Sequence, residues 1–188
     1  DPNWNASFLG ILETETGPVV MAGGDTKIAI ADGTGGKVWD RTTNMLSGMS
    51  SFRFVALAYL DGYWLATEGV TDSWYISAIA DPTTWDVLDQ GLAGMRADAL
   101  RQMVTNEGQL LALGDDTLEW YWNSGEADFP FTRVSGAGQE IGAAGQWSAA
   151  VVDKSVFWLD NQGRVVRSTG NSYQVVSTPE LERRISEY

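Results

Sequence analysis

Acidic residues recur at the predicted turns of this chain, and carboxylates are the side chains on which most of its possible chemistry would depend. Asp25, Asp72, Asp115, Asp116 and Asp160 stand in turns ahead of comparable apolar segments. A ring of such carboxylates could bind calcium or a cationic ligand. Asp is also a preferred turn residue, and the chain has no D-x-[DN]-x-[DN]-G calcium loop. We therefore interpret these acids as turn formers and expect no bound metal.

The sequence contains no histidine and no cysteine. This excludes Ser-His-Asp and Cys-His mechanisms, thiolate zinc sites and a disulfide framework. A sialidase-like Ser-x-Asp-x-Gly-x-Thr-Trp turn is only approximated by Asp81-Pro82-Thr83-Thr84-Trp85, which lacks the glycine. The arginines are scattered and suggest no triad for binding a carboxylate. We expect a protein that is not an enzyme and needs no cofactor.

A spacing of 46 residues organises the elements that carry these side chains. Similar apolar segments occur at Ile28–Ala31, Trp74–Ser77, Trp120–Asn123 and Val166–Thr169, each 46 residues after the last. A repeat of 40 to 50 residues built from short strands is typical of propeller blades, which have four strands each. The sequence therefore predicts an all-β fold, a β-propeller-like array of four-stranded antiparallel blades.

The repeat divides residues 1–177 into four expected blades. Their approximate bounds are 1–46, 47–92, 93–138 and 139–177. In the first blade we expect strands over 7–12, 19–22, 27–31 and 37–41. In the second, the Asp61-Gly62 pair between apolar segments predicts a tight hairpin.

The last residues, 178–188, differ in kind from the blades. Thr178-Pro179-Glu180 places a capping residue before a proline at the first helical position, with an acid in the first turn. Leu181 and Ile185 are four residues apart and would share one face. A short C-terminal helix is expected here.

Tryptophan is frequent, with nine residues in 188. Trp64 and Trp158 fall on expected second strands, while Trp74 and Trp120 open expected third strands. Repeated positions indicate a repeated packing role between blades. Tryptophans exposed at blade tips would instead suit stacking on sugars, so a carbohydrate-binding, lectin-like β-propeller remains the alternative function.

The chain is strongly acidic, with 25 acidic residues, 12 basic residues and a net charge of −13. Because nucleic-acid affinity comes mostly from Lys and Arg, we expect no sequence-specific nucleic-acid binding. The longest apolar runs are the length of strands and fall short of the roughly 20 residues that a membrane helix needs. No membrane insertion is expected.

Several ordered segments resemble one protein family. Trp74–Asp86 and Glu119–Val134, followed by Glu140–Ala144, Ser155–Leu159 and Val176–Glu180, are similar to the packaged-DNA stabilisation proteins, or tail hubs, of short-tailed phages (podoviruses). The resemblance covers about residues 50–188. The first 50 residues match only by their blade pattern.

The resemblance implies a structural virion protein without catalytic residues. Such hubs form a homo-oligomeric ring, a hexamer in the family, beneath the portal protein. They close the DNA exit channel after packaging and anchor the tail needle and tailspikes. The protein would then lie in the virion (the phage tail), and in the host cytoplasm during assembly. Family members are longer and this chain begins with Asp1, so we expect a propeller portion of a longer protein.

Two outer turns and the C-terminal helix are the predicted partner interface, because loops on a rigid scaffold usually carry the contacts. The residues are Asp81, Pro82, Thr83 and Thr84 in the first turn, and Gly125, Asp128, Phe129 and Pro130 in the second. Alanine substitution across 128–130 is expected to weaken assembly without affecting folding. The acidic surface is expected to repel DNA and let the genome slide past.

Overall fold

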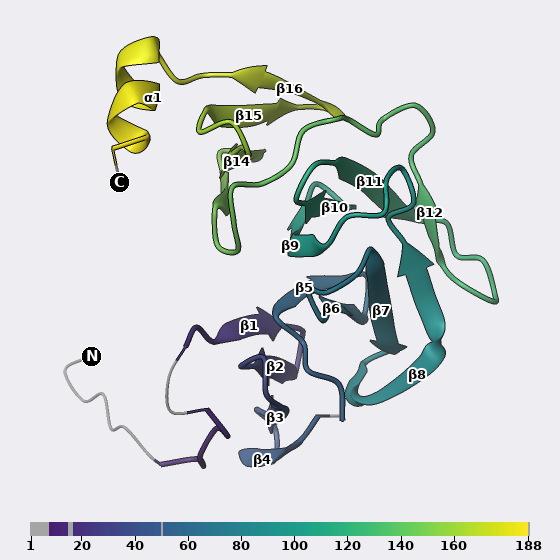
Figure 1. Ribbon diagram of the computed structural model, residues 1–188. Coiled ribbons are helices and arrows are strands. Elements are labelled where there is room, and N and C mark those ends of the chain that lie inside the picture. Colours follow the sequence, from purple (N-terminus) through teal and green to yellow (C-terminus); the bar gives the residue numbers. More distant parts are fainter. Residues whose placement is uncertain (1–7, 15–16, 50, 188) are drawn as a thin grey trace.

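A computed structural model describes residues 8–14, 17–49 and 51–187 of the protein. In these residues, 16 strands form four antiparallel sheets of four strands, and one α-helix follows. Within each sheet the strands pair in the order of the sequence, and the sheets follow one another along an open arc (Figure 1). The predicted fold class, a propeller-like array of four-stranded blades with a short C-terminal helix, is confirmed.

We number the four sheets as blades 1 to 4. Blade 1 contains β1 (Val20–Gly23), β2 (Lys27–Ala31), β3 (Gly36–Asp40) and β4 (Met45–Gly48). Blade 2 contains β5 (Ala56–Leu60), β6 (Tyr63–Thr67), β7 (Ser73–Ala78) and β8 (Asp81–Leu92). Blade 3 contains β9 (Leu100–Asn106), β10 (Gln109–Gly114), β11 (Leu118–Asn123) and β12 (Phe131–Arg133). Blade 4 contains β13 (Ala149–Val152), β14 (Ser155–Leu159), β15 (Val165–Thr169) and β16 (Ser172–Val175), and α1 (Pro179–Ile185) follows it.

The 46-residue spacing holds for blades 2 to 4 and fails at the step from blade 1 to blade 2. The second strands β6, β10 and β14 begin at Tyr63, Gln109 and Ser155, each 46 residues after the last. However, β2 begins at Lys27, only 36 residues before Tyr63. Ile28 therefore lies on a second strand, and its distance from the third-strand Trp74 does not reflect equivalent positions. Most of the difference between the spacings of 36 and 46 residues comes from the outermost strands, because β8 has 12 residues and β4 has four.

Blade 1 consequently differs from its expected strands. The prediction of a strand over 7–12 is wrong for residues 8–12, which form no strand. Residue 7 lies outside the described residues. Val20–Gly23 is the innermost strand instead of the second. The outermost strand is Met45–Gly48, which the sequence analysis missed and which crosses the expected boundary at 46/47. The alternation of apolar residues in a short strand predicts which of its faces is buried, but it does not predict the position of the strand within a blade.

The core consists of the contacts between successive blades. On β10, Leu110 and Ala112 pack towards blade 2, while Leu111 and Leu113 pack towards blade 4. All four side chains are buried. Neighbouring residues of a strand point to opposite faces. The second strand of a blade that has neighbours on both sides is therefore apolar at successive residues.

Four tryptophans occupy these interfaces, as expected from their repeated positions. Trp64, Trp74, Trp120 and Trp158 are each at most 2% exposed. Trp74 lies close against the backbone of the neighbouring strand, where a Cβ on Gly91 would come within 2.4 Å of its ring. A glycine is therefore required opposite this side chain.

The C-terminal helix forms as expected. The Thr178 hydroxyl accepts a hydrogen bond from the Leu181 amide, and Pro179 occupies the first turn. None of the helix residues is buried. Throughout the described residues, no helical segment has the length and hydrophobicity of a membrane span.

The buried tryptophans should dominate stability. We predict that Trp158→Ala lowers the free energy of unfolding by about 3–5 kcal/mol, because it leaves a large cavity between blades 3 and 4. Trp122→Ala is the matched control, since Trp122 is 45% exposed and its loss should cost about 0.5 kcal/mol or less. Urea titration of both variants measures the difference. Equal losses would show that the interface between blades does not limit stability.

Candidate functional site

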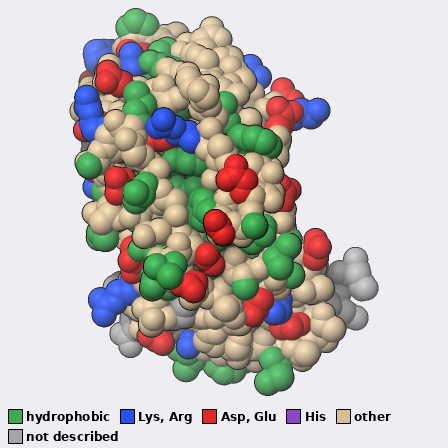
Figure 2. Space-filling model, turned by 90° about the vertical axis from the view of Figure 1, so that its right-hand side faces the viewer, with side chains coloured by type: hydrophobic (Ala, Val, Ile, Leu, Met, Phe, Trp, Pro, Cys, Tyr) green, Lys and Arg blue, Asp and Glu red, His purple; other side chains and the backbone are tan. Residues whose placement is uncertain are grey.

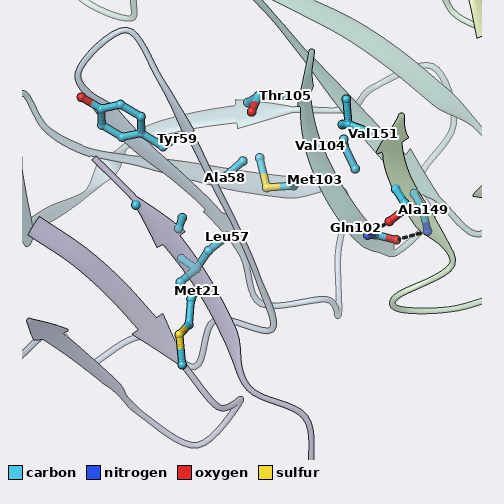
Figure 3. A pocket seen from close by; sticks show the side chains of 13 residues that line it. Met21, Leu57, Ala58, Tyr59, Gln102, Met103, Val104, Thr105, Ala149 and Val151 are labelled. Atoms are coloured by element: carbon cyan, nitrogen blue, oxygen red, sulfur yellow. Dashed lines mark hydrogen bonds between the residues drawn. The ribbon is translucent and has the colours of Figure 1, made fainter. Parts of the chain in front are cut away.

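A pocket of about 380 Å³ lies at the axis, where the innermost strands of all four blades converge (Figure 3). It is lined by backbone and by uncharged side chains such as Met21, Leu57 and Met103. Gln102 joins blade 3 to blade 4 here. Its amide nitrogen donates to the Ala149 carbonyl and its amide oxygen accepts from the Ala149 amide, both at 3.0 Å (Figure 3). The pocket supplies packing and hydrogen bonds, and its lining offers no acid–base pair.

Two carboxylates of the described residues are fully buried, and each has its own basic partner. Glu119, on β11, accepts hydrogen bonds from the Met95 amide at 2.7 Å and from Tyr121 and Arg133 at 3.1 Å. Burial, together with the charge of Glu119, raises the pKa of the Tyr121 phenol, which therefore stays a donor. This network holds the connection after blade 2 against blade 3.

Asp160 follows β14 and is also inaccessible. It accepts from the Gln162 and Arg164 amides at 2.9 and 2.7 Å and from the Arg164 guanidinium at 2.6 Å. These bonds order the β14–β15 turn. Glycoside hydrolysis needs two carboxylates that flank one bond, whereas the buried acids in the described residues are each neutralised in separate blades. In the same residues, no cluster of acidic side chains is arranged to hold a metal ion.

The first predicted interface segment is part of a strand. Asp81, Pro82, Thr83 and Thr84 begin β8, and the turn itself is at residues 79–80, where Ala80 has φ 56°. The prediction of a turn at 81–84 was therefore wrong. Proline is tolerated because β8 is an edge strand that needs no donor there.

Asp81 makes contacts within the fold. Its carboxylate accepts from the Thr83 and Thr84 hydroxyls at 2.8 and 2.9 Å and pairs with Lys27 Nζ of blade 1 at 3.0 Å. Pro82 is buried, and Thr84 is the exposed member of the segment. Residues 81–84 thus tie blade 2 to blade 1, while Thr84 remains available to a partner.

The second predicted segment is a loop, as expected, between β11 and β12. Gly125 and Asp128 are exposed, whereas Phe129 is half-buried and Pro130 is buried. The Phe129 ring packs edge-on against Trp74 at 5.3 Å between ring centroids. Because Trp74 pairs with Gly91 and Ala78 pairs with Asp81, the two predicted segments lie at opposite ends of blade 2 and do not form one surface.

An exposed apolar feature of the rim, the outer edge formed by β4, β8, β12 and β16, was not predicted from the sequence. The pairing of β7 with β8 shifts between Trp85 and Gln90, and the intervening residues bulge outward. In this bulge, Val87 and Leu88 are 60% and 80% exposed. The Asp86 carboxylate accepts from the Leu88 amide at 2.9 Å and fixes the bend. Bulges often mark positions where a sheet edge is adapted to a function.

The rim combines apolar and acidic groups. Figure 2 shows acidic side chains interspersed with hydrophobic ones over the face that it displays. Apolar groups that break an acidic surface favour contact with proteins over contact with nucleic acid. Fold and rim together define a propeller-like scaffold with an exposed apolar bulge at its edge.

Solved structures of other proteins share this fold. The computationally designed Ika4 protein has a TM-score of 0.52 and 18% identity, over 87% of this chain and 98% of that one. The extracellular domain of a putative one component system, BT4673 from B. thetaiotaomicron, has a TM-score of 0.59 and 7% identity, over 91% of this chain and 24% of that one. Hsv2 of Kluyvelomyces marxianus has a TM-score of 0.52 and 9% identity, and this chain spans about half its length. A search among curated proteins gave no match.

A family model matches residues 2–188, nearly the whole chain. The chain belongs to the phage stabilisation family, described as bacteriophage P22 Gp10, beta-propeller. This confirms the resemblance found in the sequence and extends it to the first blade. The protein is thus a structural β-propeller of the phage virion.

The link between blades 1 and 2 should depend on pH. Burial raises the pKa of Asp81, but hydrogen bonds from Thr83, Lys27 and Thr84 outweigh it and lower the pKa from 3.8 to about 2. A lowered carboxylate pKa stabilises the folded state above pH ~4, and this contribution disappears as the pH falls towards 2. We predict that Asp81→Asn costs about 1 kcal/mol at pH 6, discounted because the side chain is 35% exposed, and little near pH 2.

Unfolding titrations of both proteins at several pH values measure this difference. Asp128→Asn, the same change at an exposed loop position, is the control and should have no effect at either pH. A cost for Asp81→Asn that does not vary between pH 6 and pH 2 would contradict an ionic contribution.

Proposed function

We propose that the protein acts as a tail hub that attaches to the portal, closes the DNA exit channel after packaging and anchors the tail needle and tailspikes. The family match over residues 2–188 is the observation that carries this proposal. In this role the chain works within a homo-oligomeric ring, for which the family resemblance suggests a hexamer. Its blades keep the contact segments at fixed positions, and no reaction is required.

The rim supports the proposal with specific candidates for contact. Val87 and Leu88 stand out from β8 as an apolar pair beside acidic groups, and the exposed tip at Gly125–Asp128 projects between β11 and β12. Exposed apolar side chains surrounded by polar groups mark protein interaction sites. The packing of Phe129 on Trp74 is instead internal to the fold. Substituting residues 128–130 together would therefore disturb packing as well as assembly.

The lectin alternative has less support. Sugar stacking needs exposed aromatic faces, yet the four tryptophans at repeated blade positions are buried. Trp122 and Trp147 are 45% and 42% exposed, but Trp122 lies within β11 and Trp147 lies in the connection before β13. That alternative was based on tryptophans exposed at blade tips, and among the described residues only these two tryptophans are exposed.

Substitution of the bulge tests the hub. We predict that Val87→Ser with Leu88→Ser lowers DNA retention at least tenfold when the protein is supplied to packaged, hubless heads, because exposed apolar anchors commonly contribute about 1–2 kcal/mol or more. Stability should change by about 0.5 kcal/mol or less. Retained DNA is measured by nuclease protection.

Val70→Ser is the control, because Val70 is 75% exposed but lies in the β6–β7 turn. It should retain DNA like the unaltered protein. Full retention by the double variant would remove the bulge from the interface. Heads that retain DNA equally well without the protein would contradict the hub function itself.

The acidic surface generates a separate prediction. Because 25 acids face 12 bases, the isolated protein should bind duplex DNA with a dissociation constant weaker than about 100 μM at about 50 mM salt. Fluorescence anisotropy of a labelled duplex measures this. Micromolar or tighter binding would contradict the idea that the hub lets the genome slide past.

A further inference from the structure

Trp147 has a left-handed backbone conformation, with φ 75°, although it is a large aromatic residue. The other non-glycine residues with positive φ in the described part of the chain lie in turns between paired strands: Asn44, Asp61, Ala80, Glu107, Asp153 and Lys154. Trp147 lies instead in the connection between blades 3 and 4, where no hairpin requires this conformation. It is 42% exposed, so packing in the core does not account for the strain. Strained residues of this kind mark functional sites more often than other positions do.

The turn that precedes β13 and carries this tryptophan is held on two sides. The Ala144 amide donates to the Leu159 carbonyl at 2.9 Å, and the Leu159 amide donates to the Ser148 carbonyl at 3.2 Å. Both ends of the turn are therefore fixed at the end of β14. Between them, Gln146 Nε2 donates to the carbonyl of Val55, which precedes β5, at 3.1 Å. The indole is thus carried by a backbone that is tied to both blade 4 and blade 2.

A pocket of about 100 Å³ lies beside this turn. Its lining comes from the turn itself, from the β2–β3 turn and from the segments before β1 and β5: Pro18, Asp32, Gly33, Val55, Gln146 and Trp147. Pockets for drug-sized ligands measure about 300–1,000 Å³. This pocket therefore has room for the end of one side chain, and its lining combines an aromatic residue with one acidic residue.

The acidic residue is fixed in place by its own turn. Asp32 Oδ1 accepts hydrogen bonds from the Thr34 amide, the Thr34 hydroxyl and the Gly35 amide, each at 2.8 Å. Asp32 Oδ2 accepts from the Thr14 amide at 3.1 Å, which leaves this oxygen with capacity for a further donor. Burial raises the pKa of Asp32, but these hydrogen bonds outweigh it and lower the pKa to about 2. The side chain is therefore a carboxylate at neutral pH.

This carboxylate differs from other acids of the protein in having no basic partner. Glu119 and Asp160 are each paired with an arginine, and Asp81 is paired with Lys27. No ion pair among the described residues includes Asp32. The pocket thus places an unpaired negative charge next to a half-exposed indole. This combination fits a cation that also has a flat surface.

We propose that this pocket binds the guanidinium group of an arginine side chain from another protein, stacked on the Trp147 indole and paired with the Asp32 carboxylate. A guanidinium is planar, stacks on aromatic rings and donates from a rigid fork, whereas an ammonium is compact and strongly hydrated. The net charge of −13 favours the approach of a basic partner. The proposal concerns the chemistry of this pocket and does not depend on the hub function.

Nuclear magnetic resonance of the ¹⁵N-labelled full chain tests the proposal, with N-acetyl-arginine amide as the probe. The indole N–H signal of Trp147 is identified by its absence from the spectrum of Trp147→Gly. This signal and that of the Gly33 amide should shift and saturate, with a dissociation constant of about 1–10 mM. N-acetyl-citrulline amide has nearly the same shape without the charge and should bind at least about tenfold more weakly.

Two substitutions and one control separate binding from folding. Trp147→Gly and Asp32→Asn should each weaken binding at least about tenfold, because one removes the ring and the other the charge. Asp32 also orders its turn, but glycine suits the backbone at position 147, so Trp147→Gly should stay folded, which a urea titration checks. Trp122→Ala is the matched control, since Trp122 is 45% exposed on β11 and should bind the probe like the unaltered chain.

The outcomes that would overturn the proposal are distinct from those that concern the hub. No saturable shift of the Trp147 indole up to about 50 mM probe would remove the site. Equal binding by folded Trp147→Gly, or by the citrulline probe, would also overturn it. Equal binding of N-acetyl-lysine amide would overturn the assignment to arginine. None of these results depends on whether packaged heads retain their DNA.

Discussion

The fold depends on the burial of apolar surface between successive blades. A single four-stranded sheet has two apolar faces and can bury each one only against a neighbour. Leu110 and Leu111, adjacent on β10, are both inaccessible because blades 2 and 4 cover opposite sides of the same strand. The stability of any blade is therefore shared with the next, as in other repeat architectures. On the outward faces of blades 1 and 4, Ile30 and Phe157 are only half-buried.

Polar side chains join the elements where strand pairing cannot. The innermost strands of different blades are not paired with each other. The side-chain amide of Gln102 joins two of them, because it both donates to and accepts from the backbone of Ala149. Ser77 and Ser168 each accept a backbone amide of the neighbouring second strand, from Trp64 and Val156. The Trp64 indole donates to the Ala22 carbonyl of blade 1 at 2.9 Å. The bonds of Gln102 and Trp64 join different blades, whereas the two serine bonds join strands within blades 2 and 4.

Much of the architecture could be predicted from the sequence because strands of a propeller repeat their chemistry at a fixed interval. Asp61-Gly62 formed the expected hairpin, and the cap at Thr178 formed the expected helix. Blade 1 was misaligned because Lys27–Ala31 shows only the alternation of a strand, which is the same for a second or a third strand. Asp81-Pro82 has the composition of a turn but opens an edge strand, where the missing proline donor carries no cost.

The candidate interface was harder to predict than the fold, for a physical reason. Val87 and Leu88 are apolar, and nothing in their local sequence indicates that they are exposed. Their exposure results from a bulge set by the register between β7 and β8. Phe129 read as a loop residue free to bind a partner, but it packs on Trp74, which is distant in sequence. In both cases the exposure of a side chain depends on contacts with segments that are distant in the sequence, and local composition does not reveal these contacts.

Charge and packing act at different places on this protein. A net charge of −13 disfavours indiscriminate association, so stable contacts require local apolar surface that outweighs the repulsion. The bulge of β8 offers such surface, because Val87 and Leu88 are 60% and 80% exposed there. The buried acids Glu119 and Asp160 contribute nothing to this repulsion, because each is neutralised by its own arginine. Contacts with partners are therefore expected where apolar groups interrupt the acidic surface.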